Sequence, residues 1–442
     1  MAGFERVRRQ SQSATDHPRK VRTVVSISGI KGMNDILPGE VETWQTLEEA
    51  ARRIFRGYGF SEIRVPVVEK TELFCRSIGE ATDIVEKEMY TFTDKGGTSL
   101  TLRPEGTAPV MRAFIEHKLH ARDPLAKLYY LGPMFRYERP QKGRYRQFHQ
   151  IGAEVIGLED PRCDAQVLVM LAHYFEDIGI SDVRLQINSL GCPECRPGYR
   201  RALVAFLESR LDALCADCRR RWQTNPLRVL DCKVPGCKEA TAAAPLVLDH
   251  LCADCADHFG QVQAHLNDLG TPFEVNPRMV RGLDYYTRTT FEMVTGSLGA
   301  QNAVAAGGRY DGLIRDLGGP PLPGIGFAIG VERLVLLKAG DQVAPRLDCY
   351  IATLSEEAAR RAFVVMNRLQ RSGLQVETDF EGKSLKAQMR RAGKLGARFV
   401  VILGGDELAA GKVQLRDMDA GSQQDLPLAE LEERLHALMA KG

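Results

Sequence analysis

The sequence lacks the features that mark a membrane-spanning, secreted or fibrous protein. Among its 442 residues, no uninterrupted apolar run approaches the roughly 18 residues that a membrane helix needs. Its start has no apolar segment of the kind that secretory signals carry. Hydrophobic residues make up 44% of the chain and charged residues 26%, which is typical of a globular protein. We therefore expect no membrane contact and a cytoplasmic location.

A large net charge is also absent. The chain has 59 Lys and Arg against 57 Asp and Glu, a net charge of +2. This small net charge gives no sign of a nucleic-acid partner, so any basic surface that binds one must be confined to part of the chain. Residues 1–25 are rich in Arg and Ser but also hold Glu5 and Asp16, which disfavours an organelle transit peptide. We expect a flexible N-terminal tail there.

Standard phosphate, metal and hydrolase motifs are missing as well. The Gly-Lys-Ser at 382–384 lacks the earlier glycine of a P-loop, because position 377 is Glu. Residues 324–330 form GxGxxxG rather than GxGxxG, so a dinucleotide-binding fold is disfavoured. Neither HExxH nor GxSxG occurs. The sequence therefore contains no motif that would indicate a zinc peptidase or a serine hydrolase.

The first three quarters of the chain contain many segments with the residue pattern of β-strands. Apolar spacing predicts a helix over 44–58, alternation predicts an edge strand over 60–69 around Pro66, and Lys95-Gly96-Gly97 predicts a hairpin turn. Residues 127–157 read as two antiparallel strands, since their connection is too short for a parallel crossover. Residues 324–337 read as a strand that enters a helix.

Two regions depart from this pattern. Residues 192–258 combine helical runs with cysteine pairs and read as an inserted small domain. Strands and helices alternate in residues 346–442, which predicts an α/β domain with a mainly parallel sheet. We therefore expect the main domain over 26–345, interrupted by the insertion.

Four arginines lie in strand-like runs that we expect to be buried. They are Arg103, Arg136, Arg281 and Arg333. Because a guanidinium is a rigid fork of donors that suits phosphate oxygens, the four can form a polyphosphate cage without a P-loop. Structural ion pairs are the alternative for each of them. The candidate carboxylates are Glu138, Glu154 and Glu292.

Five segments together resemble class II aminoacyl-tRNA synthetases, and specifically bacterial histidyl-tRNA synthetases. They are RPEGT at 103–107, FRYER with its loop at 135–154, RGLDYYTRTTFE at 281–292, AAGGRYDG at 305–312 and GVER at 330–333. FRYER and GVER look like motifs 2 and 3 of the class. The blocks at 281–292 and 305–312 are similar to the two histidine-specific blocks. The resemblance begins with KGMNDILP at 31–38 and covers nearly the whole chain.

The resemblance implies an α+β catalytic domain on an antiparallel sheet, a helical Cys-rich insertion and a C-terminal α/β anticodon-binding domain. It also implies a homodimer, with Pro66 matching the interface proline of motif 1. The implied activity is that of a histidine–tRNA ligase. Histidine and ATP give histidyl-adenylate and pyrophosphate, with Mg²⁺ on the phosphates, and the 3′ adenosine of tRNA then accepts the histidyl group.

The resemblance also implies residue roles at the active site. Arg136 and Arg281 contact the α-phosphate, Arg333 the γ-phosphate and Arg144 the distal phosphates, and Arg281, Arg136 and Arg333 are the catalytic set. Glu105 would hold the α-ammonium of histidine, while Glu154 and Tyr286 engage opposite imidazole nitrogens. The full histidine pocket comprises Glu105, Thr107, Gln150, Glu154, Tyr285 and Tyr286. Aromatic packing is the alternative for each tyrosine alone.

Two basic segments are candidates for tRNA contact. The loop at 141–146, with Gln141 and Arg144, lies next to the implied ATP site and would meet the acceptor end. The other segment is a stripe spaced by three and four residues. It consists of Lys383, Lys386, Arg390, Lys394 and Arg398. A solvated helix face is the alternative for this stripe.

Eight of the 11 cysteines fall in four pairs within the insertion. The pairs are Cys192/Cys195, Cys215/Cys218, Cys232/Cys237 and Cys252/Cys255. Such spacing indicates metal binding, and four pairs allow two four-thiolate zinc sites in three pairings, with His250 or His258 as substitute ligands. Free thiols or redox-formed disulfides are the alternative. The resemblance does not supply these cysteines.

Two other functions compete with the enzyme. One is a catalytically silent synthetase paralog that regulates another protein by sensing histidine or tRNA. Such paralogs tend to lose the histidine-specific arginine or the anticodon domain, and this chain keeps Arg281 and runs on to Gly442. The other is a zinc-stabilised RNA-binding protein, which leaves the buried arginines unexplained.

Overall fold

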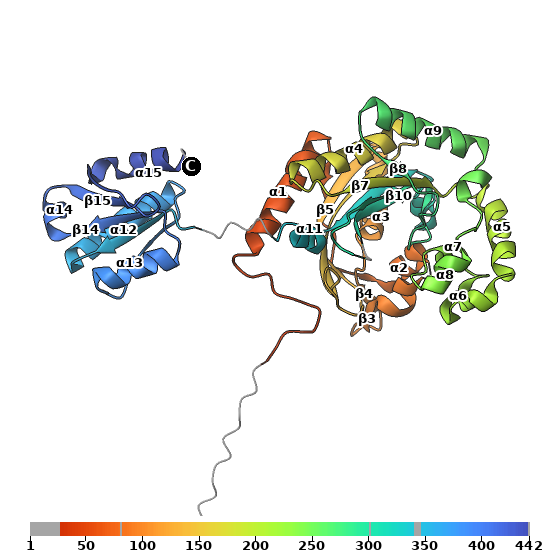
Figure 1. Cartoon of the computed structure of the whole chain (residues 1–442), viewed down its shortest axis with the longest axis horizontal. Helices are drawn as coiled ribbons and strands as arrows, with labels where there is room; N and C mark the ends of the chain where they lie inside the picture. Colours follow the sequence, from red (N-terminus) through yellow and green to blue (C-terminus); the bar gives the residue numbers. More distant parts are fainter. Residues whose placement is uncertain (1–26, 80–81, 300–301, 340–345, 441–442) are drawn as a thin grey trace, which may run out of the picture.

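The structure is a computed structural model that describes residues 27–79, 82–299, 302–339 and 346–440 (Figure 1). The expected tail over 1–25 lies outside the described residues. Among the helices that are described, none combines the length and the apolarity needed to cross a bilayer.

An eight-stranded sheet forms the centre of the larger domain, in the order β1-β5-β6-β11-β10-β9-β7-β8. Its strands are β1 (Ser61–Glu62), β5 (Ala126–Phe135), β6 (Gln147–Ile156), β7 (Arg184–Ser189), β8 (Glu274–Val275), β9 (Thr287–Val294), β10 (Ala303–Arg309) and β11 (Gly324–Gly330). The strands from β5 to β7 in this order pair antiparallel, and the two edge pairings are parallel. This confirms the antiparallel sheet predicted from the sequence.

Helices cover both faces of this sheet (Figure 1). One face packs against α1 (Val41–Gly57), α4 (Pro161–Asp177), α9 (Ala253–Asp268) and α11 (Val331–Leu337). The other packs against α3 (Thr107–Glu116) and α10 (Leu313–Asp316). Adjacent residues of β5 divide between the faces, as strand geometry requires: Tyr129 joins the first core and Tyr130 the second. The helix predicted over 44–58 is confirmed by α1.

A small sheet of β2 (Val68–Lys70), β4 (Ser99–Leu102) and β3 (Tyr90–Thr93) lies beside α2 (Thr71–Ile78) and the single-turn π-helix at Ile84–Glu88. The pairing of β3 with β4 confirms the predicted hairpin. The single strand expected over 60–69 is wrong. Pro66 separates β1 from β2, which belong to different sheets, because proline has no N–H to donate to a ladder.

The Cys-rich insertion is helical, as expected. It contains α5 (Arg196–Glu208), α6 (Ala216–Arg221), α7 (Leu227–Leu230) and α8 (Pro235–Ala240), with short 3₁₀ turns at Leu211–Ala213 and Val247–His250. A separate hydrophobic cluster holds these helices together, and Cys218, Cys232 and Cys237 are part of it. The following α9 contributes Phe259 and Val262 to the core of the eight-stranded sheet instead.

The C-terminal domain has a five-stranded sheet in the order β13-β12-β14-β15-β16. Its elements are β12 (Cys349–Thr353), α12 (Glu356–Arg371), β13 (Val376–Thr378), α13 (Leu385–Lys394), β14 (Phe399–Leu403), α14 (Gly405–Ala409), β15 (Lys412–Asp417), β16 (Gln423–Pro427), a 3₁₀ turn at Leu428–Glu430 and α15 (Leu431–Met439). β12 pairs parallel with β13 and β14, but β15 and β16 pair antiparallel. The mainly parallel sheet was therefore a wrong prediction, because the connections to β15 and β16 are too short for parallel crossovers.

Candidate active site

A cavity of about 290 Å³ brings together side chains from five segments that are distant in sequence. The predicted residues that line it are Glu105, Thr107, Arg136, Arg144, Gln150, Arg281, Tyr285, Tyr286 and Arg333. They come from the start of α3, the loop between β5 and β6, β6 itself, the segment before β9, and α11. Gln150 Oε1 is buried and has no hydrogen-bond partner among the described residues, so the cavity offers an acceptor to a ligand.

Three arginines crowd one side of this cavity. Arg136 Nε donates to the carbonyl of Pro104 at 2.9 Å, and Arg144 Nε lies 2.8 Å from a carboxylate oxygen of Glu138. Burial, and then the charge of Arg144, lower the pKa of Arg333. Glu138 and Glu292 offset only part of this effect on Arg333, so an anionic ligand would stabilise the charge of this wall.

Arg103 does not join the other arginines. It is buried, and its guanidinium donates to the carbonyls of Val65 and Pro133, each at 2.9 Å. This side chain therefore ties the segment before β2 to β5 and has a structural role. The cage expected from four buried arginines contains Arg136, Arg144, Arg281 and Arg333 instead.

Arg281 has a carboxylate partner and still faces the cavity. One of its terminal nitrogens lies 2.5 Å from Glu292, and its guanidinium carbon lies 5.2 Å from the centre of the Tyr286 ring. Its Nε is buried without a hydrogen-bond partner in the described structure. The ion pair that we considered as an alternative is present, but it leaves donors of this guanidinium for a ligand.

Two buried carboxylates, those of Glu105 and Glu154, lie in or next to the cavity wall. Glu105 accepts the backbone N–H groups of Thr107 at 2.6 Å and Ala108 at 2.8 Å at the start of α3, and burial raises its pKa. Glu154 accepts the hydroxyls of Thr107 at 2.7 Å and Tyr310 at 2.5 Å. Glu154 thus lies behind the cavity wall in this structure, and Glu105 lies in it.

The glycines of 324–330 make room for Glu154. A Cβ added to Gly326 would lie 1.8 Å from a carboxylate oxygen of Glu154, which no side chain can accommodate. The glycine pattern that superficially resembled a dinucleotide motif therefore serves close packing of β11 against a buried carboxylate on β6.

Sequence reasoning missed two residues that position this site. Tyr310 binds Glu154, and Glu332 accepts the backbone N–H of His149 with both carboxylate oxygens, at 2.8 and 2.9 Å. Glu332 thereby fixes the start of α11 to β6 and places the adjacent Arg333. Both residues lie inside quoted motifs, AAGGRYDG and GVER, so position in a motif was the available signal.

Glu154 gives this fold a pH dependence. Burial raises its pKa to about 8, from an ordinary value of 4.5. Between these values the folded protein keeps a proton that the unfolded chain releases. The free energy of unfolding should therefore fall as pH rises through this window, by up to about 1.4 kcal/mol per pH unit from this group.

We expect Glu154→Gln to flatten this decline, because the amide does not titrate. Urea denaturation at several values between about pH 5 and about pH 8 measures how the free energy of unfolding changes with pH. The control is Glu116→Gln, which changes an exposed carboxyl of α3. Parallel stability curves for the wild type and Glu154→Gln would contradict the assignment.

The eight cysteines of the insertion form two groups of four. Cys192, Cys195, Cys252 and Cys255 are one group, and Cys215, Cys218, Cys232 and Cys237 are the other; within each, the sulfurs all lie within 4.8 Å of one another. Four of the Sγ pairs within these groups are 3.7 to 3.9 Å apart. Tetrahedral zinc with bonds of about 2.3 Å requires sulfurs about 3.8 Å apart, whereas a disulfide requires about 2.05 Å.

The histidines considered as substitute ligands are elsewhere. His258 Nε2 lies 3.3 Å from the carbonyl of Glu159 and 3.6 Å from Asp164, and the ring of His250 packs against Tyr199. Neither belongs to the two thiolate groups. Each group of four cysteines therefore supplies a full tetrahedral ligand set by itself.

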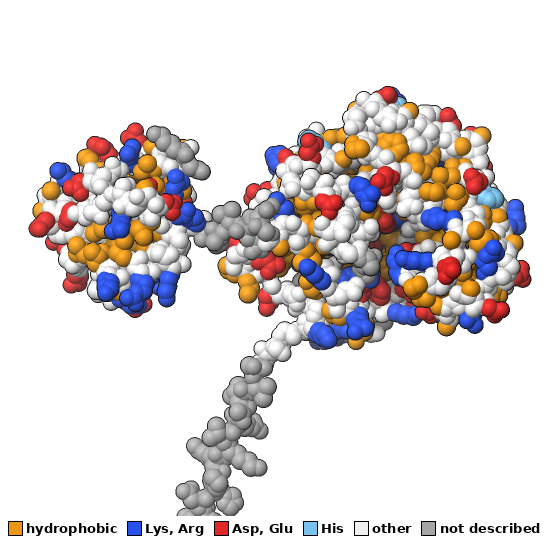
Figure 2. Space-filling model, viewed as in Figure 1, with side chains coloured by type: hydrophobic (Ala, Val, Ile, Leu, Met, Phe, Trp, Pro, Cys, Tyr) orange, Lys and Arg blue, Asp and Glu red, His pale blue; other side chains and the backbone are white. Residues whose placement is uncertain are grey.

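The basic stripe of the C-terminal domain is only partly helical. Lys386, Arg390 and Lys394 lie on α13 and are exposed, and Lys383 precedes this helix. Figure 2 shows Lys and Arg side chains gathered where Figure 1 places α13. Arg398 leaves the stripe, because its guanidinium donates to the carbonyl of Leu438 on α15.

Comparisons with known proteins agree with this architecture. The family described as histidyl-tRNA synthetase matches residues 32–334, and an anticodon binding domain family matches residues 348–438. A histidine–tRNA ligase of Syntrophotalea carbinolica is 71% identical over 412 residues, 93% of this chain and 98% of that protein. One from Geobacter sulfurreducens is 67% identical over 402 residues, 91% of this chain and 97% of that protein.

A solved structure gives the same result at the level of the fold. The crystal structure of apo histidyl-tRNA synthetase from S. aureus is similar with a TM-score of 0.78 and 38% sequence identity, and the match covers 93% of this chain and all of that one. Fold, family match and sequence identity agree over nearly the full chain. The chain belongs to the histidyl-tRNA synthetase family.

Proposed function

We infer that this chain is a histidine–tRNA ligase that activates L-histidine with ATP and transfers it to the 3′ end of its tRNA. The observation that carries this inference is a single cavity that combines four arginines with the buried Glu105 and two tyrosines, in a member of this family. One wall suits a polyphosphate and the other suits an amino acid that carries ring nitrogens.

Adenylate formation uses the arginine wall. Mg²⁺ would accompany ATP and neutralise part of the phosphate charge, and Glu138, which lines the cavity, would offer it a carboxylate oxygen. We propose that Arg136 and Arg281 contact the α-phosphate, Arg333 the γ-phosphate and Arg144 the distal phosphates. The histidine carboxylate attacks the α-phosphorus and pyrophosphate leaves. Fixed cationic donors stabilise the charge that develops there.

Histidine binding uses the opposite wall. We propose that Glu105 pairs with the α-ammonium, whose positive charge would offset the burial that raises the pKa of this carboxyl. Gln150 offers its unpartnered oxygen, and Tyr286 binds one imidazole nitrogen. Glu154 reaches the other nitrogen when its contact with Thr107 is exchanged for a ring N–H. Amino acids without these nitrogens would leave buried polar groups unpaired.

The tRNA meets two basic surfaces in this proposal. Gln141 and Arg144 lie on the loop beside the cavity, where the acceptor end must enter for transfer. The exposed basic stripe of Lys383, Lys386, Arg390 and Lys394 faces the phosphate backbone at the anticodon end.

Removal of the stripe tests the functional proposal. We expect Lys386→Ala, Arg390→Ala and Lys394→Ala together to raise KM for tRNA roughly tenfold or more in charging with labelled histidine, because counterion release is lost. Histidine-dependent pyrophosphate exchange should not change. The control combines three exposed arginines outside α13 and loses the same charge. It is Arg361→Ala, Arg371→Ala and Arg434→Ala. Equal KM values for the two triple variants would reject the stripe, and absence of histidine charging by the wild type would reject the function.

We propose structural zinc in both thiolate groups, which hold together helices with a small core of their own. Metal analysis of reduced protein purified without chelators should give about two zinc ions per chain. Cys218→Ser should lower this by about one and lower the melting temperature. Cys75→Ser, outside both groups, is the control. Protein without zinc under these conditions would contradict the proposal.

We further propose a cytoplasmic homodimer. The segment around Pro66 leads into β2, and Val68 and Phe92 of the small sheet are exposed apolar side chains that a second copy would cover. Light scattering of the purified chain distinguishes a dimer from a monomer. Phe92→Lys, which places a charge on this surface, should shift the equilibrium toward monomer.

A further inference from the structure

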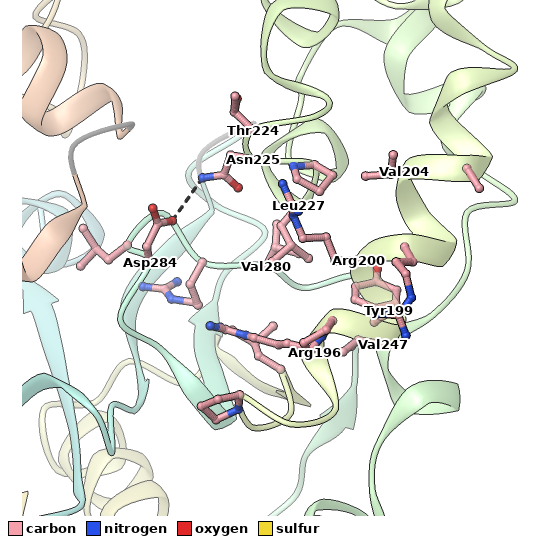
Figure 3. Close-up of a pocket in the computed structure, with 18 of the residues that line it drawn as sticks. Arg196, Tyr199, Arg200, Val204, Thr224, Asn225, Leu227, Val247, Val280 and Asp284 are labelled. Carbon is pink, nitrogen blue, oxygen red and sulfur yellow. Dashed lines mark hydrogen bonds between the residues drawn. The ribbon is translucent and has the colours of Figure 1, made fainter. Parts of the chain in front are cut away.

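The histidine-specific segment before β9 depends on the insertion for its anchoring. Residues 280–286 contain no strand, and Asp284 N–H donates to the carbonyl of Ile78 at 3.2 Å. Two further contacts come from the insertion. Arg196 on α5 donates to the carbonyl of Tyr286, and the Asn225 side chain donates to Asp284 at 3.2 Å. Figure 3 shows Asn225 and Asp284 in this contact and Arg196 on another wall of the same cavity.

Arg196 is placed to act on the pocket through the backbone. Its guanidinium lines a cavity of about 770 Å³ that also exposes Arg281, and its Nε is buried without a hydrogen-bond partner among the described residues. The carbonyl that it binds belongs to the residue whose ring packs against Arg281 at 5.2 Å. A shift of this carbonyl therefore moves Tyr286 and the guanidinium beside it.

The thiolate group of Cys192, Cys195, Cys252 and Cys255 sets the position of Arg196. Cys195 directly precedes it at the N-cap of α5. A Cβ at Gly191 would lie 2.5 Å from the Cys195 sulfur, so the chain before the group packs directly on it. Residues 190–191 pair with Arg288. The N–H of Leu190 donates to the carbonyl of Arg288 at 2.7 Å, and the N–H of Arg288 donates to the carbonyl of Gly191 at 2.9 Å.

Arg288 shows that these contacts hold a costly backbone conformation. Its φ of 45° lies in the left-handed region, where a residue with a side chain is strained. The two hydrogen bonds between Arg288 and 190–191 and the contact of Arg196 with Tyr286 thus fix the chain on both sides of Thr287, where β9 begins. All three originate next to the same thiolate group.

We propose that Arg196 is a positioning residue for histidine recognition, and that the metal-binding group of Cys192, Cys195, Cys252 and Cys255 controls histidine affinity through it. The proposal rests on the proposed function, since Tyr286 would contact histidine and Arg281 beside it would contact the α-phosphate that histidine attacks. The second thiolate group meets the same segment at a different point, because Asn225, which binds Asp284, lies between Cys218 and Cys232. The insertion thereby becomes a determinant of the amino-acid site.

Substitution of Arg196 tests the proposal. We expect Arg196→Ala to raise KM for histidine in pyrophosphate exchange by roughly tenfold to a hundredfold, because small displacements of positioning groups have effects of this size. KM for ATP should rise much less, since Arg281 is only one of the four arginines proposed to contact ATP, and Arg136, Arg144 and Arg333 are held by other segments. Arg196→Lys, which keeps one donor, should recover part of the affinity. Equilibrium dialysis with labelled histidine checks binding without chemistry.

Two controls separate this effect from loss of folding. Arg201→Ala lies on the same helix, is exposed and should match the wild type. Cys252→Ser should reproduce the histidine effect of Arg196→Ala and lose about one zinc ion, while Arg196→Ala keeps its zinc.

Three results would overturn the proposal: an unchanged histidine KM in Arg196→Ala, equal increases of the histidine and ATP KM, or Cys252→Ser that binds histidine normally. Failure of the proposed function looks different. In that case the wild type itself shows no histidine-dependent exchange.

Discussion

Arg281→Ala should lower the rate of histidyl-adenylate formation by on the order of a hundredfold or more, while binding of ATP and histidine stays detectable. The arginine lines the cavity, and its buried Nε has no partner in the part of the chain that the structure describes. Loss of one fixed donor to developing charge typically has an effect of this size. Single-turnover measurement of adenylate, with dialysis for each ligand, separates chemistry from binding.

Glu292→Gln is the matched control, because Glu292 is the carboxylate paired with Arg281 at 2.5 Å. If Arg281 acts on phosphate, the amide variant keeps the guanidinium in place and retains most of the rate. If the ion pair alone matters, both variants lose the same activity. An unchanged adenylation rate in Arg281→Ala would remove this residue from the catalytic set.

Arg309→Ala should lower the free energy of unfolding by about 3–5 kcal/mol, the largest stability effect that we expect from a single substitution. Arg309 is fully buried and lies 2.5 Å from Asp164 and 3.1 Å from Asp311, and it donates to the carbonyl of Leu158 at 2.6 Å. Its removal leaves Asp164 buried without its main partner. Urea denaturation followed by circular dichroism measures the change.

Arg315→Ala is the control for this substitution. Arg315 forms an exposed ion pair with Asp316 on α10, and such pairs contribute up to about 1 kcal/mol. Similar unfolding midpoints for the Arg309 and Arg315 variants would show that the buried network does not hold the sheet to α4. Arg309 lies in AAGGRYDG, a segment that resembles a histidine-specific block. In the structure its guanidinium pairs with the buried Asp164 instead of lining the cavity.

Short-range sequence patterns correctly predicted the elements that depend mainly on neighbouring residues, such as α1 and the turn between β3 and β4. Trp44 and Leu47 recur at helical spacing because one stripe of α1 faces the core, and the double glycine at 96–97 marked the turn between β3 and β4. Pro66 misled the prediction in part. It was assigned to an edge strand, whereas it lies in the connection between β1, which ends at Glu62, and β2, which begins at Val68.

Contacts between distant segments could not be derived from pattern. Nothing near Arg103 in the sequence indicates that its donors reach carbonyls at 65 and 133, and nothing near Glu154 indicates that Tyr310 binds it. The cysteine spacing predicted metal binding but left three pairings open. The structure selects one of them, because pairing depends on how α5 and α9 approach each other in space.

The most direct test of the account is pyrophosphate exchange into ATP, run with each of the twenty amino acids and without tRNA on folded, zinc-replete protein. It isolates the first chemical step, which the arginine wall and the histidine wall must perform together. The account predicts exchange with histidine alone. Exchange with another amino acid, or none at all, would contradict it, and absence of exchange would favour a regulatory paralog that binds histidine without activating it.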